Sequence, residues 1–347
     1  MPSSPELTQA RTMFPGAPGY LDTATMGLPP APALEEISAA VDDWRRGRAS
    51  APGYDAWVDR GRAAFARLVG VPETQVAIGS QLSAFVGLIA ASLPSGSEVV
   101  CAEGDFTSVL FPLLVQGQRL TVRTVPLERL ADEVRPATDL IAVSAVQSLD
   151  GRIADLDAIA ASARAHGATT FIDATQACGW LPLDASQFDF LACSAYKWLL
   201  SPRGTCFLTV GPGRLGDVKP LLAGWYAGED RWSSIYGDSM VLARDARRLD
   251  LSPAWLSWVG TAPALEMLTQ LGVRSIGTHA VGLANLLRDH LGLPSSPSAM
   301  LLLGRPGAAE RLERAGIRAS VRGQGVRLGF HLYNDENDVD DVAAALT

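Results

Sequence analysis

The stretch FLACSAYKWLLSPRGTCFL, residues 190–208, contains Lys197, one of only two lysines in a chain of 347 residues. Apolar runs on both sides of Lys197 predict two buried strands with the lysine between them. The other lysine, Lys219, precedes a proline in GDVKPLL, where a solvated charge is expected. Arginine stands at nearly all other basic positions. A guanidinium is not a nucleophile, so an amine kept in an apolar setting indicates Schiff-base chemistry at Lys197.

Outward from this stretch, short apolar runs alternate with helical patterns between residues 75 and 210. The expected strands are 75–79, 98–103, 119–127, 139–146, 169–175, 188–194 and 204–210, and the expected helices are 83–93, 108–116 and 155–167. Strands that are apolar on both faces are typical of a sheet covered on both sides. The pattern predicts an α/β fold with a mostly parallel seven-stranded sheet between helices.

The pattern changes near residue 250, where a smaller α+β domain is expected. It comprises one helix over 260–291, strands 298–304, 317–322 and 325–333, and helices 308–316 and 336–346. We therefore predict a large domain over 15–250 and a small domain from 1–14 plus 251–347. Residues 211–249 lack periodicity and predict either a long interface loop or a partly helical linker.

Composition limits the classes of function. A net charge of −8 argues against nucleic acid or an anionic membrane as the main partner. The N-terminus lacks the pattern of a signal peptide, and no apolar run is long enough to span a bilayer, so a cytoplasmic protein is expected. The four cysteines form no CxxC pair and the four histidines are scattered, so neither a disulfide framework nor a metal site is expected.

Polar side chains follow several of the predicted strands at their carboxyl ends, where open parallel sheets bind ligands. They are an acid, amides, hydroxyls, an aromatic ring and the lysine: Gln81, Asp105, Phe106, Ser148, Asp173, Gln176, Ser194, Tyr196 and Lys197. Taken singly, Asp173 could be a solvated cap and Lys197 could extend to the surface. Together, an amine for an aldehyde, a carboxylate for a pyridine nitrogen and a helix N-terminus for a phosphate indicate pyridoxal 5′-phosphate (PLP).

Four stretches carry a resemblance to a known family. They are YLDTATMGLPP (20–30), FIDATQACGWLPLD (171–184), CSAYKWLLSPRG (193–204) and VRLGFHLYNDENDVD (326–340). The chain resembles the class V aminotransferases among the fold-type I PLP enzymes, a family that includes cysteine desulfurases, kynureninases and isopenicillin N epimerase-like proteins. The resemblance extends from about residue 18 to the C-terminus.

The resemblance implies roles around the cofactor ring. Lys197 would form the Schiff base and carry protons, and Asp173 would pair with the pyridine nitrogen. Gln176 would hydrogen-bond the ring hydroxyl. Phe106 stands where relatives have an aromatic residue, often His, stacked on the ring. Ser148 falls where relatives often have Asn.

The resemblance also implies which residues would bind the cofactor phosphate and the substrate carboxylate. Ser194 and Tyr196 would contact the phosphate, together with the backbone amides of Gln81 and Leu82. Arg327 would take the substrate carboxylate as a bidentate pair. No obvious second arginine is placed for a dicarboxylate. The segment 223–232 resembles a loop that reaches a partner subunit, so we expect a homodimer with active sites at the interface.

Departures from the family pattern narrow the choice of reactions. Relatives often have Thr-Thr where this chain has Gln81-Leu82, so phosphate binding would rely more on the backbone. Desulfurases carry a catalytic cysteine in the C-terminal third, and this chain has no cysteine after Cys206. A persulfide-forming desulfurase is therefore not expected.

Three functions remain open from the sequence. An aminotransferase would use Lys197 to move a proton away from Cα of an amino acid. A β-eliminating lyase, such as a C–S lyase or a kynureninase-like enzyme, would take the same proton and release a leaving group. A non-catalytic PLP-binding module is the third, which the full set of Lys197, Asp173 and Arg327 disfavours. The aromatic residues between 225 and 255 could line a substrate pocket or pack a subunit interface.

Overall fold

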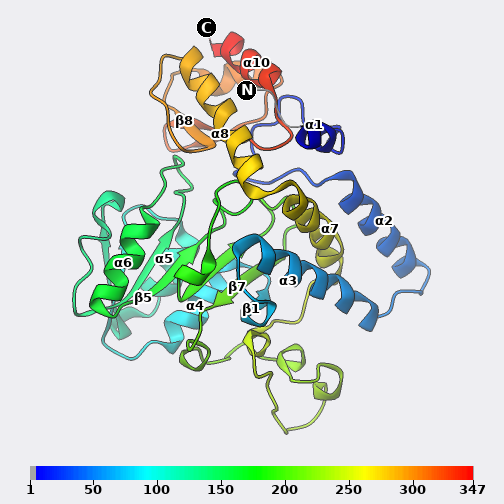
Figure 1. The fold of residues 1–347 in the computed structure, drawn as a ribbon, viewed down its shortest axis with the longest axis vertical. Helices are drawn as coiled ribbons and strands as arrows, with labels where there is room; N and C mark the ends of the chain where they lie inside the picture. Colours follow the sequence, from blue (N-terminus) through cyan, green and yellow to red (C-terminus); the bar gives the residue numbers. More distant parts are fainter. Residues whose placement is uncertain (1–4, 347) are drawn as a thin grey trace.

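The computed structural model describes residues 5–346, and its largest element is a seven-stranded sheet in the order β1-β7-β6-β5-β4-β2-β3 (Figure 1). The strands are β1 Val76–Gly79, β2 Ser97–Ala102, β3 Leu120–Val125, β4 Thr138–Ser144, β5 Thr169–Asp173, β6 Phe190–Ser194 and β7 Cys206–Val210. Strands β3, β2, β4, β5 and β6 are parallel, whereas β7 runs antiparallel to both β6 and β1. All seven predicted strands are present, and the mostly parallel α/β fold is confirmed.

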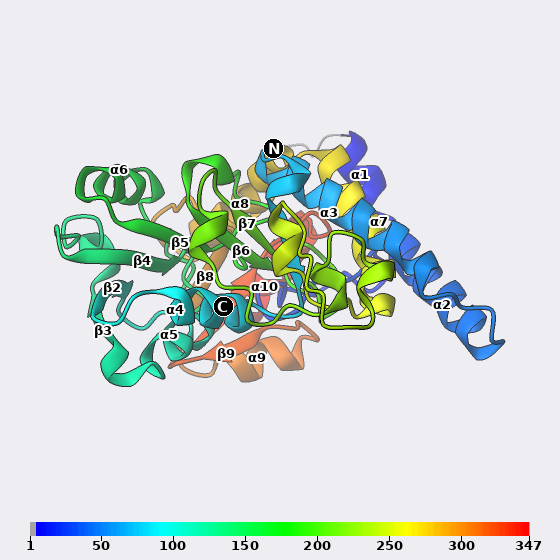
Figure 2. The ribbon, with the colours of Figure 1, turned by 90° about the horizontal axis from the view of Figure 1, so that it is seen from below.

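Both faces of this sheet are buried except at its edge strand β3, as the apolar runs predicted. Successive residues of β2 alternate between two hydrophobic clusters, with Val100 and Ala102 in one and Val99 and Cys101 in the other. Helix α6 (Leu156–His166) covers one face, while α4 (Leu82–Ser92) and α5 (Thr107–Leu114) cover the other (Figure 2). The carboxyl ends of β4, β5 and β6 thus meet at one edge between two helical layers.

A second, smaller sheet lies beyond that edge (Figure 1). It is antiparallel in the order β8-β10-β9, with strands β8 Met300–Leu303, β9 Ser320–Arg322 and β10 Gly325–Gly329. Helices α8 (Val273–His290), α9 (Ala308–Arg314) and α10 (Glu336–Leu346) accompany it. The predicted α+β composition is present, with strands shorter than the apolar runs suggested.

The remaining elements include three helices that the sequence pattern did not predict: α1 Pro5–Arg11, α2 Ala31–Arg45 and α3 Asp55–Val69. Residues 211–249 form short 3-10 turns joined by loops: η6 Leu215–Asp217, η7 Trp225–Ala227, η8 Trp232–Ser234 and η9 Ala246–Leu249. Further 3-10 turns are η1 Pro52–Tyr54, η2 Glu73–Gln75, η3 Gly117–Arg119, η4 Leu127–Arg129 and η5 Ala185–Gln187. Among residues 5–346, no helix combines the length and apolar character needed to cross a bilayer.

The single helix expected over 260–291 is wrong. The structure has two helices, α7 (Trp255–Leu271) and α8, which meet at Gly272 with φ +78°. A residue with positive φ cannot continue a right-handed helix, and glycine adopts positive φ without steric cost. Helix α7 packs against α2 and α3, whereas α8 packs against β8 and α10. Apolar residues recur at helical spacing on both sides of Gly272, so the pattern concealed the break. The predicted division into two domains near residue 250 stays a prediction. Residues 1–4 and 347 of the predicted small domain lie outside the described chain.

Candidate active site

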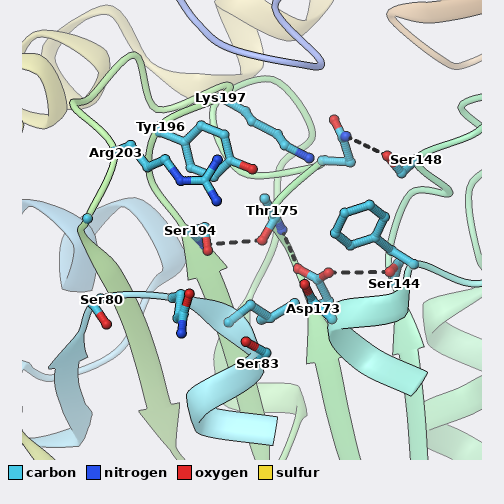
Figure 3. A pocket seen from close by; sticks show the side chains of 16 residues that line it. Ser80, Ser83, Ser144, Ser148, Asp173, Thr175, Ser194, Tyr196, Lys197 and Arg203 are labelled. Atoms are coloured by element: carbon cyan, nitrogen blue, oxygen red, sulfur yellow. Dashed lines mark hydrogen bonds between the residues drawn. The ribbon is translucent and has the colours of Figure 1, made fainter. Parts of the chain in front are cut away.

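A cavity of about 220 Å³ opens where β4, β5 and β6 end (Figure 3). Nine of the ten predicted site residues line it: Gln81, Leu82, Phe106, Ser148, Asp173, Gln176, Ser194, Tyr196 and Lys197. The other lining residues are Ser80, Ser83, Ser108, Ser144, Thr175, Arg203 and Gly204. The carboxyl ends of the central strands therefore bring the predicted residues together.

Asp173, the last residue of β5, is a buried carboxylate at the floor of the cavity. Its Oδ1 accepts from the backbone N–H of Thr175 at 2.8 Å, and its Oδ2 from the hydroxyl of Ser144 at 3.4 Å. Among residues 5–346 no cation lies within ion-pair distance of it. Burial raises the pKa of Asp173 to about 6, and the nearby Asp105 adds to the rise. This carboxylate is suited to a positively charged group in the cavity.

Lys197 follows β6 and is almost fully buried, with 5% of its surface exposed. Its Nζ lies 5.2 Å from the ring centre of Phe106 and 5.7 Å from that of Tyr196. Burial lowers the pKa of Lys197 to about 8; Asp173 opposes the shift, and Arg327 adds to it. The amine is thus closer to its neutral, nucleophilic form than an exposed lysine.

Gln176 and Ser148 form a hydrogen-bonded wall beside the lysine. The amide oxygen of Gln176 accepts from Trp198 Nε1 at 2.7 Å, which fixes the orientation of the amide. Its Nε2 donates to the carbonyl of Ala24 and to Ser148 Oγ, both at 3.0 Å. The hydrogen bond predicted from Gln176 to a cofactor hydroxyl would therefore replace one of these two.

The start of α4 forms another wall of the cavity. The cap residue Gln81 makes no side-chain hydrogen bond to the first turn of the helix. The first N–H groups of a helix lack intrahelical partners and attract anions. Ser80 and Ser83 add hydroxyls beside them. This wall is suited to a phosphate.

Arg203 is a site residue that the sequence analysis missed. Its guanidinium lies 5.0 Å from the ring centre of Tyr196, and Figure 3 shows the two side chains together at one end of the cavity. It lies in the quoted stretch CSAYKWLLSPRG, six residues after Lys197. Arg203 lies in a loop, away from the end of any predicted strand, and a position at a strand end is what indicated the other residues. Arg203 gives this end of the cavity a positive charge.

Ser144, Thr175 and Asp105 were also not assigned roles, and all three surround Asp173. Ser144 ends β4, and its backbone N–H donates to Asp105 Oδ2 at 2.8 Å. Thr175 accepts from the backbone N–H of Ser194 at 3.1 Å, which links β5 to β6. The apolar run predicts a strand that ends at residue 146, whereas β4 ends at Ser144. Ser144 was therefore not predicted to lie at a strand end as Asp173 was.

Arg327 is the one predicted residue that does not line the cavity. It is 1% exposed and lies behind Ser148. Its Nη1 donates to the carbonyl and, at 3.2 Å, to the hydroxyl of Ser148, and its Nη2 donates to Thr25 Oγ1 at 2.8 Å. Its Nε has no hydrogen-bond partner among the described residues. Burial and the neighbouring Arg322 lower the pKa of Arg327 to about 10, as expected for a cation without a close anion.

Gly27 packs the chain segment before α2 against residues 195–205, the loop between β6 and β7 that carries Lys197 and is called the lysine loop below. Its N–H donates to the carbonyl of Tyr196 at 2.9 Å. A Cβ at this position would overlap the carbonyl oxygen of Lys197 and lie 2.7 Å from Leu200 Cδ2. The two segments approach so closely because glycine has no side chain.

We expect Gly27→Ala to destabilise the protein by about 1–3 kcal/mol, because the backbone of the lysine loop must move. The urea midpoint of unfolding measures this. The control is Gly282→Ala in α8, where no atom lies within 4 Å of the added methyl group and a helix favours alanine. Equal stability of the Gly27 variant and the wild type would contradict the close packing.

Comparison with known families decides the class of protein. Residues 57–306 match the family described as Aminotransferase class-V, which is more than two thirds of the chain. The chain belongs to the class V aminotransferase family. The resemblance that the sequence indicated is confirmed, and this class V protein is a PLP-dependent enzyme.

Several curated relatives cover most of this class V chain. Isopenicillin N epimerase of Streptomyces clavuligerus is 28% identical, over 82% of each chain. An uncharacterized aminotransferase of Bacillus subtilis is 27% identical over 97% of each. Kynureninase of Deinococcus radiodurans is 28% identical over 62% of this chain and 57% of its own.

Solved structures share the fold of this class V enzyme. A cysteine desulfurase of Escherichia coli superposes with a TM-score of 0.83 at 22% identity, over 98% of this chain and 97% of the other. A variant of the protein C-DES, with glycine covalently linked to its PLP cofactor, gives a TM-score of 0.86 at 21% identity, over 97% and 98%. At this identity the likeness establishes the fold.

The residues of the cavity fit the family cofactor, PLP. The fit rests on a buried amine, a buried carboxylate without a cation partner and an uncapped helix N-terminus around one cavity. The expectation of PLP is confirmed. Residues 5–346 contain no cluster of His, Cys, Asp or Glu arranged for a metal ion.

Proposed function

We propose that this class V enzyme holds PLP through Lys197 and acts on the α-amino group of an amino acid as an aminotransferase. The observation that carries the proposal is the shared cavity of Lys197 and Asp173, both buried and neither in an ion pair with another residue between 5 and 346. Two such groups are costly to bury unless a ligand uses them.

The remaining residues divide between the two ends of the cofactor. PLP, when bound, supplies an electron sink that weakens the bonds at the amino acid's Cα. Asp173 would keep a proton on the pyridine nitrogen, and Phe106 would cover one face of the ring. Gln176 and Ser148 would contact the ring hydroxyl side. The phosphate would be held at the other end of the cavity by Gln81, Leu82, Ser194, Tyr196 and Arg203.

Substrate would bind on the side of Ser148. Arg327 offers the planar pair of N–H groups that suits an α-carboxylate, and its Nε has no partner in the structure. Lys197 would then take the proton from Cα and return it elsewhere, which makes it the acid–base residue of the reaction. Its pKa, lowered to about 8, suits that role near neutral pH.

A β-eliminating lyase is the second candidate, and one observation favours it. The kynureninase of Deinococcus radiodurans is a relative at 28% identity, and a lyase would use the same lysine to take the α-proton while a leaving group departs from Cβ. A persulfide-forming mechanism has less support, because no cysteine lines the cavity of the described chain and all four cysteines are buried.

The test is to incubate the enzyme with single amino acids and pyruvate. Appearance of alanine and a new keto acid, without free ammonia, supports transamination. A keto acid with free ammonia and no alanine overturns it in favour of elimination. Inversion at Cα without a keto acid overturns both in favour of epimerisation, the activity named for the Streptomyces relative.

We expect the rate at which apoprotein captures PLP to rise about tenfold per pH unit up to about pH 8 and then to level off. Only the neutral amine attacks an aldehyde. With a pKa of about 8, about a tenth of Lys197 is neutral at pH 7, against about three in ten thousand for an ordinary lysine. Stopped-flow absorbance at pH 6–10 gives the profile. A rate still rising at pH 10 would show that burial does not shift this amine.

We also propose a homodimer with active sites at the subunit interface, and a cytoplasmic location. Support for the dimer comes from exposed apolar side chains in the 211–249 segment, including Tyr236 at 93% and Met240 at 77% exposure. Support for the location comes from four cysteines that are all free thiols. The predicted domains, 15–250 and 1–14 plus 251–347, stay part of this proposal.

A further inference from the structure

A second arginine lies beside Arg327. Arg322 donates from Nη2 to Thr25 Oγ1 at 3.0 Å, the same oxygen that accepts from Arg327 Nη2 at 2.8 Å. The two Nη2 atoms can therefore be no more than about 6 Å apart. One hydroxyl of the N-terminal segment thus joins two guanidinium groups.

The β9–β10 hairpin dictates this pairing. Arg322 lies opposite Gly325, and Arg327 is two residues further along β10, so both side chains are on one face of the sheet. Gly325 has no side chain to separate them. The turn of the hairpin lies next to the cavity, because a methyl group on Gly323 would be 3.6 Å from Leu149 Cδ1, and Leu149 follows the cavity residue Ser148.

The pair of guanidinium groups, Arg322 and Arg327, has no anion close to it in the described chain. Among residues 5–346, neither guanidinium has a carboxylate within 4 Å, and Asp22 acts on Arg327 only from beyond that distance. Both arginines lower the pKa of Lys197, which places their charges near the amine in the cavity. Two like charges that share a neutral hydroxyl repel each other until anions arrive.

We propose that Arg322 binds a second carboxylate of the substrate, which makes a short dicarboxylic amino acid the preferred substrate class. The inference rests on the proposed function in one respect, since it takes Arg327 as the residue for the α-carboxylate. Arg322 is half-buried and keeps donors beyond its bonds to Thr25 and to the carbonyl of Val321. A carboxylate a few carbons from the first reaches it across the shared hydroxyl.

The test uses anions without an amino group, so its result does not depend on which reaction the enzyme catalyses. Succinate and butyrate, which have the same number of carbons, are titrated into the PLP-loaded enzyme by calorimetry. The wild type is expected to bind succinate at least about tenfold more tightly. Equal affinities would overturn the proposal at once, whatever any variant does.

The variant Arg322→Gln is expected to bring the ratio of the two affinities close to one. The matched control is Arg318→Gln, which removes an exposed positive charge two residues before β9 begins, at an arginine that is not one of the two donors to Thr25. It should keep the preference. A preference that survives Arg322→Gln, or an equal loss of both ligands, overturns the proposal, because Arg322 would then be irrelevant or part of the first carboxylate site.

Discussion

Lys197→Ala is expected to abolish covalent capture of PLP and to slow exchange of the substrate α-proton by at least about a thousandfold. A positioned general base alone contributes between a hundredfold and ten-thousandfold, and the covalent link would be lost as well. No other lysine lines the cavity in the described chain. Borohydride reduction followed by mass spectrometry measures the link, and proton NMR in heavy water measures the exchange.

The chain supplies the control for this prediction, because Lys219 is its only other lysine. Lys219 is exposed near η6, and Lys219→Ala should retain both properties. Covalent capture that persists in Lys197→Ala would assign the link to another amine and would remove the basis of the proposed function. Capture lost equally in both variants would indicate damage to folding, which the urea midpoint detects.

The central sheet could be predicted because local and global preferences agree there. Strands such as β2 and β4 are apolar on both faces, and only a sheet between two helical layers satisfies them. The direction of β7 was not evident, since an apolar strand reads alike in either orientation. The break at Gly272 was missed for a similar reason, because apolar residues at helical spacing on both sides hide a single residue with positive φ.

Nine of the ten predicted site residues reached the cavity because strand ends meet in any parallel sheet. The position of each residue just after a predicted strand is enough to place it at this edge of the sheet. What could not be predicted depends on contacts between distant segments. Thr25 reaches Arg322 and Arg327 across some three hundred residues of sequence, and Arg322 faces Arg327 only through the register of β9 on β10. A second arginine was therefore not evident from the sequence.

Asp173→Asn is expected to reduce α-proton exchange by the PLP-loaded enzyme about a hundredfold or more, while stabilising the apoprotein at alkaline pH. Asparagine keeps the shape and can accept from the Thr175 N–H as Asp173 does. It cannot hold a proton on the pyridine nitrogen through a negative charge, so the electron sink is weakened. The functional loss and the stability gain have the same origin, a carboxylate buried without a protein cation.

The sign of the stability effect follows from linkage. Burial raises the pKa of Asp173 from 3.8 to about 6, so the folded apoprotein binds the proton more tightly than the unfolded chain. Relative to the asparagine variant, the wild type therefore loses stability as pH rises through about 4 to 6. A shift of this size corresponds to about 3 kcal/mol at pH 8 and to nothing below pH 4.

Urea midpoints of both apoproteins at pH 4, 6 and 8 test this, together with proton exchange by the loaded enzymes. The control is Asp189→Asn, because Asp189 is paired with Arg214 at 2.7 Å and lies away from the cavity. That variant should be less stable than the wild type at pH 8 and unchanged in exchange rate. An Asp173 variant that is less stable at pH 8, or as active as the wild type, would mean that the buried carboxylate is held for packing and not for a cationic ligand.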